Sequence, residues 1–217
     1  MEMDRPMPQK IIFISYATLN TPYIQVIESQ LIPSLRSFKL PHYIEYITDK
    51  GNWNKNTNYK STFILKMLNK HKCPVIFLDA DATILKFPSL FYEIPNDYDL
   101  CAHYLDWHKM WRKTNGQDKR EFLSGTLWLN YNEKVLNLVQ EFIDEIRKNP
   151  SQWEQRTMSQ VLATHKDIKI YPLPYSYITF PLQSGKIPTH MVKEEDIVIY
   201  HSQASRRLKH RDKWNKK

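Results

Sequence analysis

Apolar and polar positions along the first 80 residues predict strands that alternate with helices. The segment KIIFISYA (10–17) has the continuous apolar character of a buried strand. HYIEYITD (42–49) alternates between the two kinds of position, which predicts a second, half-exposed strand. The apolar run VIFL (75–78) predicts a third strand buried on both faces.

Two segments between these strands have helical spacing. Residues 23–35 predict one amphipathic helix with Pro33 near its end. Residues 58–71 predict another, because Phe63, Ile64 and Met67 fall on one face. Strand–helix–strand–helix–strand is the order of a doubly wound α/β domain, in which ligands bind at the carboxyl ends of parallel strands.

The second half of the chain is less regular. Strands are predicted over 98–106, 121–132 and 196–203, and a polar loop over 107–120. Residues 135–146 predict the clearest helix, and 151–165 another, with Ser151 as its N-cap and Glu154 completing a capping box. We expect one α/β domain over 1–217 with a mostly parallel central sheet and a basic tail at about 204–217.

Asp79 and Asp81 directly follow the third apolar run, in FLDADAT. Residues i and i+2 of an extended chain point the same way, so the two carboxylates are expected to converge. Two adjacent anions need a cation or a shared proton to be stable. This pair is therefore the first candidate for functional chemistry.

Composition narrows the classes of protein. An apolar content of 41% and an aromatic content of 13% fit a folded domain. No apolar run approaches the ~20 residues that span a bilayer, and the first ten residues lack the apolar core of a signal peptide. With two cysteines we expect a reducing, cytoplasmic location, in a bacterial or virus-infected cell given the lysine- and asparagine-rich composition. A net charge of +8 suggests phosphate-bearing partners, or simply a solvated lysine surface.

Two interpretations of the aspartate pair compete with a metal site. The sequence D-A-D-A-T resembles the nucleophile motif of haloacid dehalogenase-like phosphatases, in which the first carboxylate attacks phosphorus. That family also needs a late acidic metal motif, and none of Gly51, Gly116, Gly125 and Gly185 is followed by Asp. The simpler alternative is a polar turn that closes the strand.

Over most of its length the chain resembles the GT-A class of nucleotide-diphospho-sugar transferases. NYKSTFILKML followed by PVIFLDADATILKFPSLF resembles the lysine helix and aspartate strand of that class. FLSGTLWLN, WEQRTMSQVL and DIVIYHSQASRR resemble, in order, the strand beneath the donor sugar, the acidic helix start and the terminal histidine strand. The resemblance implies a single GT-A domain that transfers a sugar from a nucleotide-diphosphate donor, most commonly a UDP-sugar.

The resemblance also implies a metal site. Asp81 would be the firmer ligand, Asp79 would share the metal or the ribose, and His201 would approach from the opposite side. Carboxylate ligands suit Mg²⁺ or Mn²⁺, and an imidazole favours Mn²⁺. A structural role for His201 is the alternative.

Further donor-binding residues come from the same comparison and from the residue types. Gly125 inside a strand indicates a close approach of backbone or ligand, or else a β-bulge. Arg206, Arg207 and Lys209 follow His201 closely enough to fold back onto a diphosphate, as a flexible lid or as a solvated tail. The class implies base, ribose or nucleotide contacts for four more residues, each of which could instead be a core, turn or surface residue: Tyr16, Thr18, Asp49 and Lys60.

The catalytic base and the acceptor are the least determined features. Glu154 is the first candidate for general base or sugar contact, and Asp106 is the second. The loop that carries Trp107, His108 and Trp111 would border the acceptor, because aromatic faces stack on sugars and on nucleobases. A glycan is the preferred acceptor, a modified base in DNA is the alternative, and a non-enzymatic nucleic-acid-binding domain is the third possibility. The oligomeric state is not predicted.

Overall fold

A computed structural model describes residues 10–111 and 120–211, with only the backbone for Arg207 and 209–211. Its main sheet has six strands in the order β2-β1-β3-β6-β5-β7, and β6 alone runs antiparallel to its neighbours. Beside it, two short strands form a second sheet. The predicted α/β fold with a mostly parallel sheet is confirmed. The strands are β1 (Ile12–Thr18), β2 (His42–Ile47), β3 (Val75–Leu78), β4 (Ala82–Ile84), β5 (Leu100–Asp106), β6 (Arg120–Leu129), β7 (Ile170–Pro172) and β8 (Ile199–His201).

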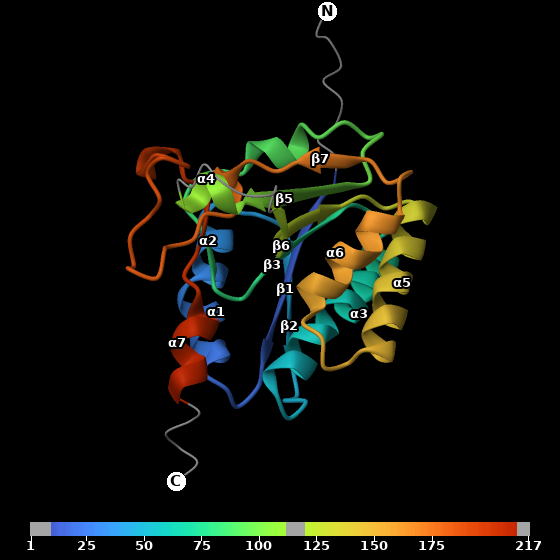
Figure 1. The fold of residues 1–217 in the computed structure, drawn as a ribbon, viewed down its shortest axis with the longest axis horizontal. Coiled ribbons are helices and arrows are strands. Elements are labelled where there is room, and N and C mark those ends of the chain that lie inside the picture. Colours follow the sequence, from blue (N-terminus) through green and yellow to red (C-terminus); the bar gives the residue numbers. More distant parts are fainter. Residues whose placement is uncertain (1–9, 112–119, 212–217) are drawn as a thin grey trace, which may run out of the picture.

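Helices cover both faces of the main sheet (Figure 1). On one side lie α1 (Tyr23–Ser29) and α2 (Leu31–Ser37), and on the other lie α3 (Trp53–His71), α5 (Glu133–Lys148) and α6 (Glu154–Thr164). Neighbouring strand residues point to opposite faces. Phe13 therefore belongs to one apolar core and Ile14 to the other. Within the described ranges, no helix combines the length and apolar character needed to cross a bilayer.

The single helix predicted over 23–35 is wrong, because the chain forms two helices there. Pro33 explains the break. A proline has no N–H for the carbonyl four residues earlier, and its ring clashes with that carbonyl. The carbonyl belongs to Ser29, the last residue of α1. In α2, Pro33 lies in the first turn, where the missing N–H is harmless.

Side-chain caps move other boundaries away from the prediction. The helix predicted from residue 58 begins at Trp53, because the Asn52 side chain accepts a hydrogen bond from the Lys55 N–H. The predicted loop 107–120 begins with a short helix, α4 (Trp107–Trp111), and residues 112–119 lie outside the described part. Asp106 caps α4, accepting from the N–H groups of His108 and Lys109 at 2.9 and 3.1 Å.

The capping box predicted from Ser151 and Glu154 is also wrong. The N-cap of α6 is Trp153, with no side-chain hydrogen bond, and Glu154 is 1% exposed. A buried carboxylate needs a cation more than it needs a surface amide, and the Glu154 carboxylate is bound to Lys60 instead. The basic tail begins as a helix, α7 (Ala204–Arg211).

The aspartate pair predicted from the sequence lies at the carboxyl edge of the main sheet. The parallel strands β1, β2 and β3 all end there. The register of β5 with β6 shifts between Cys101 and His103. Over this bulge β6 stays paired with β3, and the Asp79 N–H donates to the Gly125 carbonyl at 2.9 Å. The pairing with β3 therefore places the centre of β6 beside Asp79.

The apolar stripe of α5 generates a stability prediction. Phe142 is 2% exposed within the core on that face, whereas Asn137 on the same helix is exposed. Phe142→Ala should lower the free energy of unfolding by about 3–5 kcal/mol, because it removes buried area and leaves a cavity. Urea denaturation measures it. Asn137→Ala is the control and should change stability by less than about 0.5 kcal/mol; an equal loss in both variants would refute the packing described for α5.

Candidate active site

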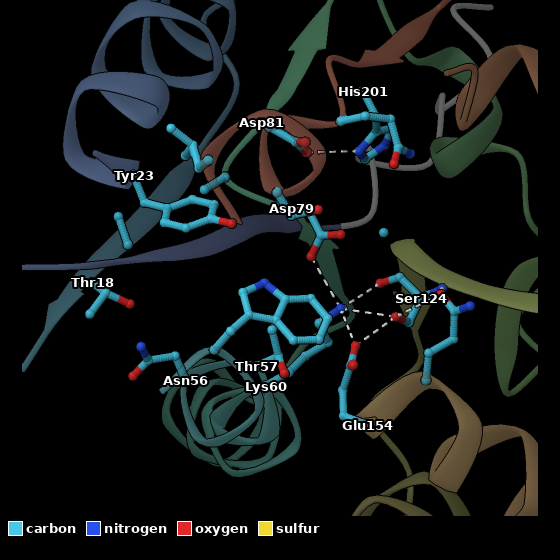
Figure 2. Close-up of a pocket in the computed structure, with 18 of the residues that line it drawn as sticks. Thr18, Tyr23, Asn56, Thr57, Lys60, Asp79, Asp81, Ser124, Glu154 and His201 are labelled. Atoms are coloured by element: carbon cyan, nitrogen blue, oxygen red, sulfur yellow. Dashed lines mark hydrogen bonds and ion pairs between the residues drawn. The ribbon is translucent and has the colours of Figure 1, made fainter. Parts of the chain in front are cut away.

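A cavity of about 760 Å³ opens at the carboxyl edge of the sheet. Its walls come from the ends of β1 and β3, the first turns of α3 and α6, the middle of β6, and α7. Segments distant in sequence meet here, as Figure 2 shows for Lys60, Asp79, Ser124, Glu154 and His201. The location matches the general rule for ligand sites in open α/β sheets.

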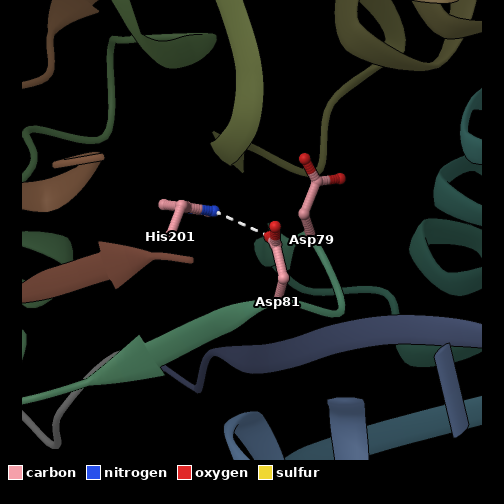
Figure 3. A group of neighbouring side chains, drawn as sticks. All are labelled: Asp79, Asp81 and His201. Atoms are coloured by element: carbon pink, nitrogen blue, oxygen red, sulfur yellow. Dashed lines mark ion pairs between the residues drawn. The ribbon is translucent and has the colours of Figure 1, made fainter. Parts of the chain in front are cut away.

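Asp79, Asp81 and His201 form a compact cluster at this cavity (Figure 3). One potential ligand atom from each residue lies within 4.8 Å of the other two. The pairing of β4 with β8, with Ala82 opposite His201, brings the histidine next to the aspartates. The His201 ring is held by Thr126, whose Oγ1 lies 2.8 Å from Nε2, and its Nδ1 lies 3.5 Å from Asp81 Oδ1.

Asp81 is held in its ionised form. Its Oδ2 accepts a hydrogen bond from the N–H of Ala204, the first residue of α7, at 2.8 Å. Burial alone would raise the pKa of Asp81, but the hydrogen bond and charge of His201, together with the Ala204 N–H, lower it below its usual value. This carboxylate is thus prepared to act as an anion.

Lys60 links the cluster to α6. Its Nζ lies 3.1 Å from Asp79 Oδ1 and 2.7 Å from Glu154 Oε1, and it donates to Ser124 Oγ at 2.9 Å. Only 4% of this side chain is exposed. Burial would lower the pKa of Lys60, but the charges of Asp79 and Glu154 outweigh it and raise the pKa, so the group stays an ammonium ion.

Asp79 is the less settled of the two aspartates. Burial at the base of the cavity raises its pKa, the ammonium of Lys60 opposes this, and the charge of Asp81 adds to it. Yet 41% of the side chain is exposed to the cavity. Of the pair, Asp79 is therefore the carboxylate whose ionisation a nearby cation would favour most.

Gly125 leaves room between Asp79 and His201. A Cβ added there would lie 3.1 Å from Asp79 Oδ2 and 3.2 Å from His201 Cε1, closer than ordinary contacts. The space that a methyl group would fill thus borders one carboxylate and the imidazole, and with the Asp81 carboxylate of the same cluster these groups are a fitting donor set for a hard divalent cation. The three residues thus form a possible metal site.

The other predicted donor-binding residues lie around the same cavity. The hydroxyl of Tyr16 donates to the carbonyl of Asn56 at 2.9 Å, and burial raises the pKa of Tyr16 well above its usual value. Asp49 accepts from the Gly51 N–H and from the Asn56 amide, both at 2.9 Å, so it also stabilises a turn. Three more of the predicted residues line the cavity, namely Thr18, Lys60 and Arg206. The side chains of Arg207 and Lys209 lie outside the described part of the chain.

The two catalytic candidates have different positions. Glu154 lines the cavity but is buried and paired with Lys60. Asp106 caps α4 and is not part of the cavity lining. Its pKa is lowered mainly by the Lys109 N–H, with a further contribution from the His108 N–H.

A hydrogen-bonded chain along the cavity was not predicted. The Ser124 hydroxyl donates to Glu154 Oε1 at 2.8 Å, and the Ser124 N–H donates to Gln155 Oε1 at 3.1 Å. The Gln155 amide then donates to Glu121 Oε1 at 2.8 Å, and the Trp107 indole N–H donates to Glu121 Oε2 at 2.6 Å. Gln155, the neighbour of the predicted site residue Glu154, was within reach of sequence reasoning. Glu121 was not, because a glutamate at the start of a strand carries no sequence signal.

Comparison with known proteins identifies the family. Residues 35–213 match the family described as nucleotide-diphospho-sugar transferase. The chain belongs to that family. It is therefore a glycosyltransferase. A search of curated proteins by sequence finds no match.

Solved structures similar to this transferase share its GT-A fold. A glycosyltransferase involved in glycosylation of the major capsid of the virus PBCV-1 has a TM-score of 0.63 at 14% identity, covering 93% of this chain and 98% of its own. The galactosyltransferase LgtC, solved with donor and acceptor sugar analogues, has 0.57 at 10%, covering 88% and 87%. Mouse xyloside xylosyltransferase 1 has 0.53 at 12%, covering 90% and 98%.

The ion pair between Lys60 and Glu154 generates a prediction about stability. The measurements are made with chelator present, so that a bound metal ion does not contribute to stability. Lys60→Met and Glu154→Gln should each lower the free energy of unfolding, the first by about 3 kcal/mol, because a buried charge loses its partner. The double variant should lose at least about 1 kcal/mol less than the sum of the two. Denaturant titration of the four proteins measures this coupling.

Lys66 and Glu45 provide a matched control. Lys66 lies on the same helix, its Nζ is also 2.7 Å from a glutamate oxygen, and its side chain is 50% exposed. The cycle with Lys66→Met and Glu45→Gln should give a coupling below about 1 kcal/mol, because solvent screens the pair. Equal coupling in the two cycles would contradict the special role of the buried pair.

Proposed function

We propose that this transferase moves a sugar from a nucleotide-diphosphate donor, with UDP as the carrier, to a hydroxyl group of a glycan, and that it depends on Mn²⁺ or Mg²⁺. The observation that carries the proposal is the cluster of Asp79, Asp81 and His201 at the carboxyl edge of the sheet, in a chain that belongs to the nucleotide-diphospho-sugar transferases. The cavity beside the cluster, about 760 Å³, is large enough for a ligand of that size.

The charges around the cavity support a metal ion together with a diphosphate. Asp79, Asp81 and Glu154 carry three negative charges and Lys60 carries one positive charge, so these four groups and a neutral His201 have a formal excess of two negative charges. A diphosphate would meet repulsion at such a site without a divalent cation. A bound Mg²⁺ or Mn²⁺ would balance the carboxylates and the negative charge that grows on the departing diphosphate.

The chain's own residues would prepare the site for the donor. His201 and the Ala204 N–H orient Asp81, and Lys60 holds Asp79 on its other side. Arg206 lines the cavity close to the ring of Phe180 and offers a guanidinium group to phosphate oxygens. Under this proposal Tyr16, Thr18 and Asp49, which line the same cavity, would contact the nucleoside.

The proposal assigns Glu154 a positioning role. Its carboxylate is buried against Lys60 and Ser124, so it orients these groups beneath the donor sugar. Its Oε1 already accepts from both Lys60 and Ser124, and only 1% of the residue is exposed, so it is scarcely accessible to an acceptor hydroxyl. The proton acceptor is therefore expected elsewhere in the cavity.

A glycan is the proposed acceptor because the cavity wall includes an indole and several hydrogen-bonding side chains, a combination that suits sugars. The galactosyltransferase with a similar fold was solved with sugar analogues of both its substrates. A modified base in DNA remains the competing acceptor, since the net charge is +8.

The donor proposal is tested by incubating the protein with a panel of nucleotide sugars and Mn²⁺ and measuring release of the nucleotide diphosphate. Asp81→Asn should lower the release rate at least about 100-fold, because it removes a proposed metal ligand. The loss of that ligand is expected to remove several kcal/mol of transition-state stabilisation. The amide retains an oxygen for the Ala204 N–H, so the thermal midpoint should stay nearly unchanged.

Asp97→Asn is the matched control. Asp97 is an exposed carboxylate paired with Lys169 at 3.0 Å, and this variant should release the diphosphate at the wild-type rate. Chelator should reduce the wild type to the level of Asp81→Asn. Full activity of Asp81→Asn in the presence of chelator would contradict the proposed metal dependence.

A further inference from the structure

Glu121 and Trp107 form a second set of recognition groups in the cavity wall. Trp107 begins α4 directly after β5, and Glu121 lies near the start of β6, opposite Leu105 of β5. The Trp107 indole N–H donates to Glu121 Oε2 at 2.6 Å. Both residues line the cavity, and neither belongs to the cluster of Asp79, Asp81 and His201.

Glu121 differs from the other carboxylates that line this cavity. Asp79 and Asp81 belong to the cluster, Glu154 is paired with Lys60, and Asp49 is held in a turn by Gly51 and Asn56. Glu121 forms no ion pair with any residue in the described part of the chain. Within that part, its hydrogen-bond partners are two uncharged donors, one on each oxygen.

These contacts fix the carboxylate without using it up. A carboxylate offers about four acceptor positions, and Trp107 and Gln155 use two of them. Because one donor holds each oxygen, the group keeps one orientation and can still accept from two further donors. Its spare positions are therefore suited to neighbouring hydroxyl groups of one ligand.

From this arrangement we infer that Glu121 and Trp107 form the subsite for the acceptor, and that the acceptor there is an uncharged sugar. The indole of Trp107, supported by the nearly parallel ring of Trp111, contacts the C–H face of the sugar, and Glu121 accepts hydrogen bonds from its hydroxyls. The inference rests on the proposed function, since it places the acceptor beside the donor site.

The charge of Glu121 favours a sugar over nucleic acid. A fixed carboxylate repels the phosphates that supply most of the affinity for a nucleic-acid strand. The same carboxylate forms strong, charge-assisted hydrogen bonds with sugar hydroxyls. An aromatic ring alone stacks on sugars and bases equally, so the carboxylate decides between the two.

The test separates acceptor binding from donor chemistry. Methyl glycosides of glucose, galactose, mannose and xylose are added to the protein saturated with UDP and Mg²⁺, and binding is measured by saturation-transfer NMR. We expect at least one glycoside to bind the wild type. Glu121→Gln and Trp107→Ala should each weaken its binding at least about tenfold, the effect of losing a hydrogen bond to a charged group or a stacking contact.

Two controls accompany these variants. Glu133→Gln changes an exposed carboxylate at the start of α5, away from the cavity, and should bind the glycoside as the wild type does. Release of UDP from the UDP-sugar donor without any acceptor should fall by a clearly smaller factor than glycoside binding in Glu121→Gln and Trp107→Ala. A merely structural defect, or a role of Glu121 only in orienting Gln155, would lower release and binding by the same factor.

Three results with the glycosides would overturn the inference, and a fourth result concerns DNA. They are no binding of any glycoside to the wild type, undiminished binding in both variants, or an equal loss of donor hydrolysis and glycoside binding. Tighter binding of a hydroxymethylated DNA duplex by Glu121→Gln, with a steep salt dependence, would overturn it in favour of nucleic acid. Failure of the proposed function is distinguishable, because the wild type would then release no nucleotide diphosphate from any nucleotide sugar.

Discussion

The buried ammonium of Lys60 is the interaction on which the rest of the site depends. It lies on α3, and its partners Asp79, Ser124 and Glu154 lie at the end of β3, in β6 and at the start of α6. Removing so hydrophilic a cation from water is costly unless anions surround it closely. Its burial therefore requires that these elements meet at one point, and it offsets part of the repulsion among the carboxylates.

The negative charge that Lys60 does not balance suits the metal-dependent transfer proposed for this chain. Lys60 balances one of the three carboxylate charges of Asp79, Asp81 and Glu154, so the two negative charges that are left match a divalent cation. The possible metal site and the proposed acceptor subsite are joined by the hydrogen bonds that run from Lys60 through Ser124 and Gln155 to Glu121. Such a continuous chain would hold the groups proposed for donor and acceptor in fixed relative positions, which is what a transfer between two bound substrates needs.

The sequence predicted the features that depend on local pattern. The apolar run before Asp79 predicted a buried strand, and the motifs in their order along the chain predicted the GT-A fold. Each of these signals consists of residues that are neighbours in the sequence. It did not predict contacts that depend on tertiary structure. The predicted capping box failed because a buried lysine competes for Glu154, and Glu121 was missed because only the pairing of β5 with β6 brings it to Trp107. The sequence placed Pro33 near the end of one helix, but it did not predict that this proline would end the first of two helices at Ser29.

The most direct test of the central claim is a titration of Mn²⁺ into the protein with and without UDP, followed by electron paramagnetic resonance of the free ion. Asp79, Asp81 and His201 supply few ligands, so Mn²⁺ alone should bind weakly. With UDP present, phosphate oxygens complete the coordination, and the affinity should rise at least about tenfold. Equal Mn²⁺ affinity with and without UDP would contradict a shared site for metal and diphosphate.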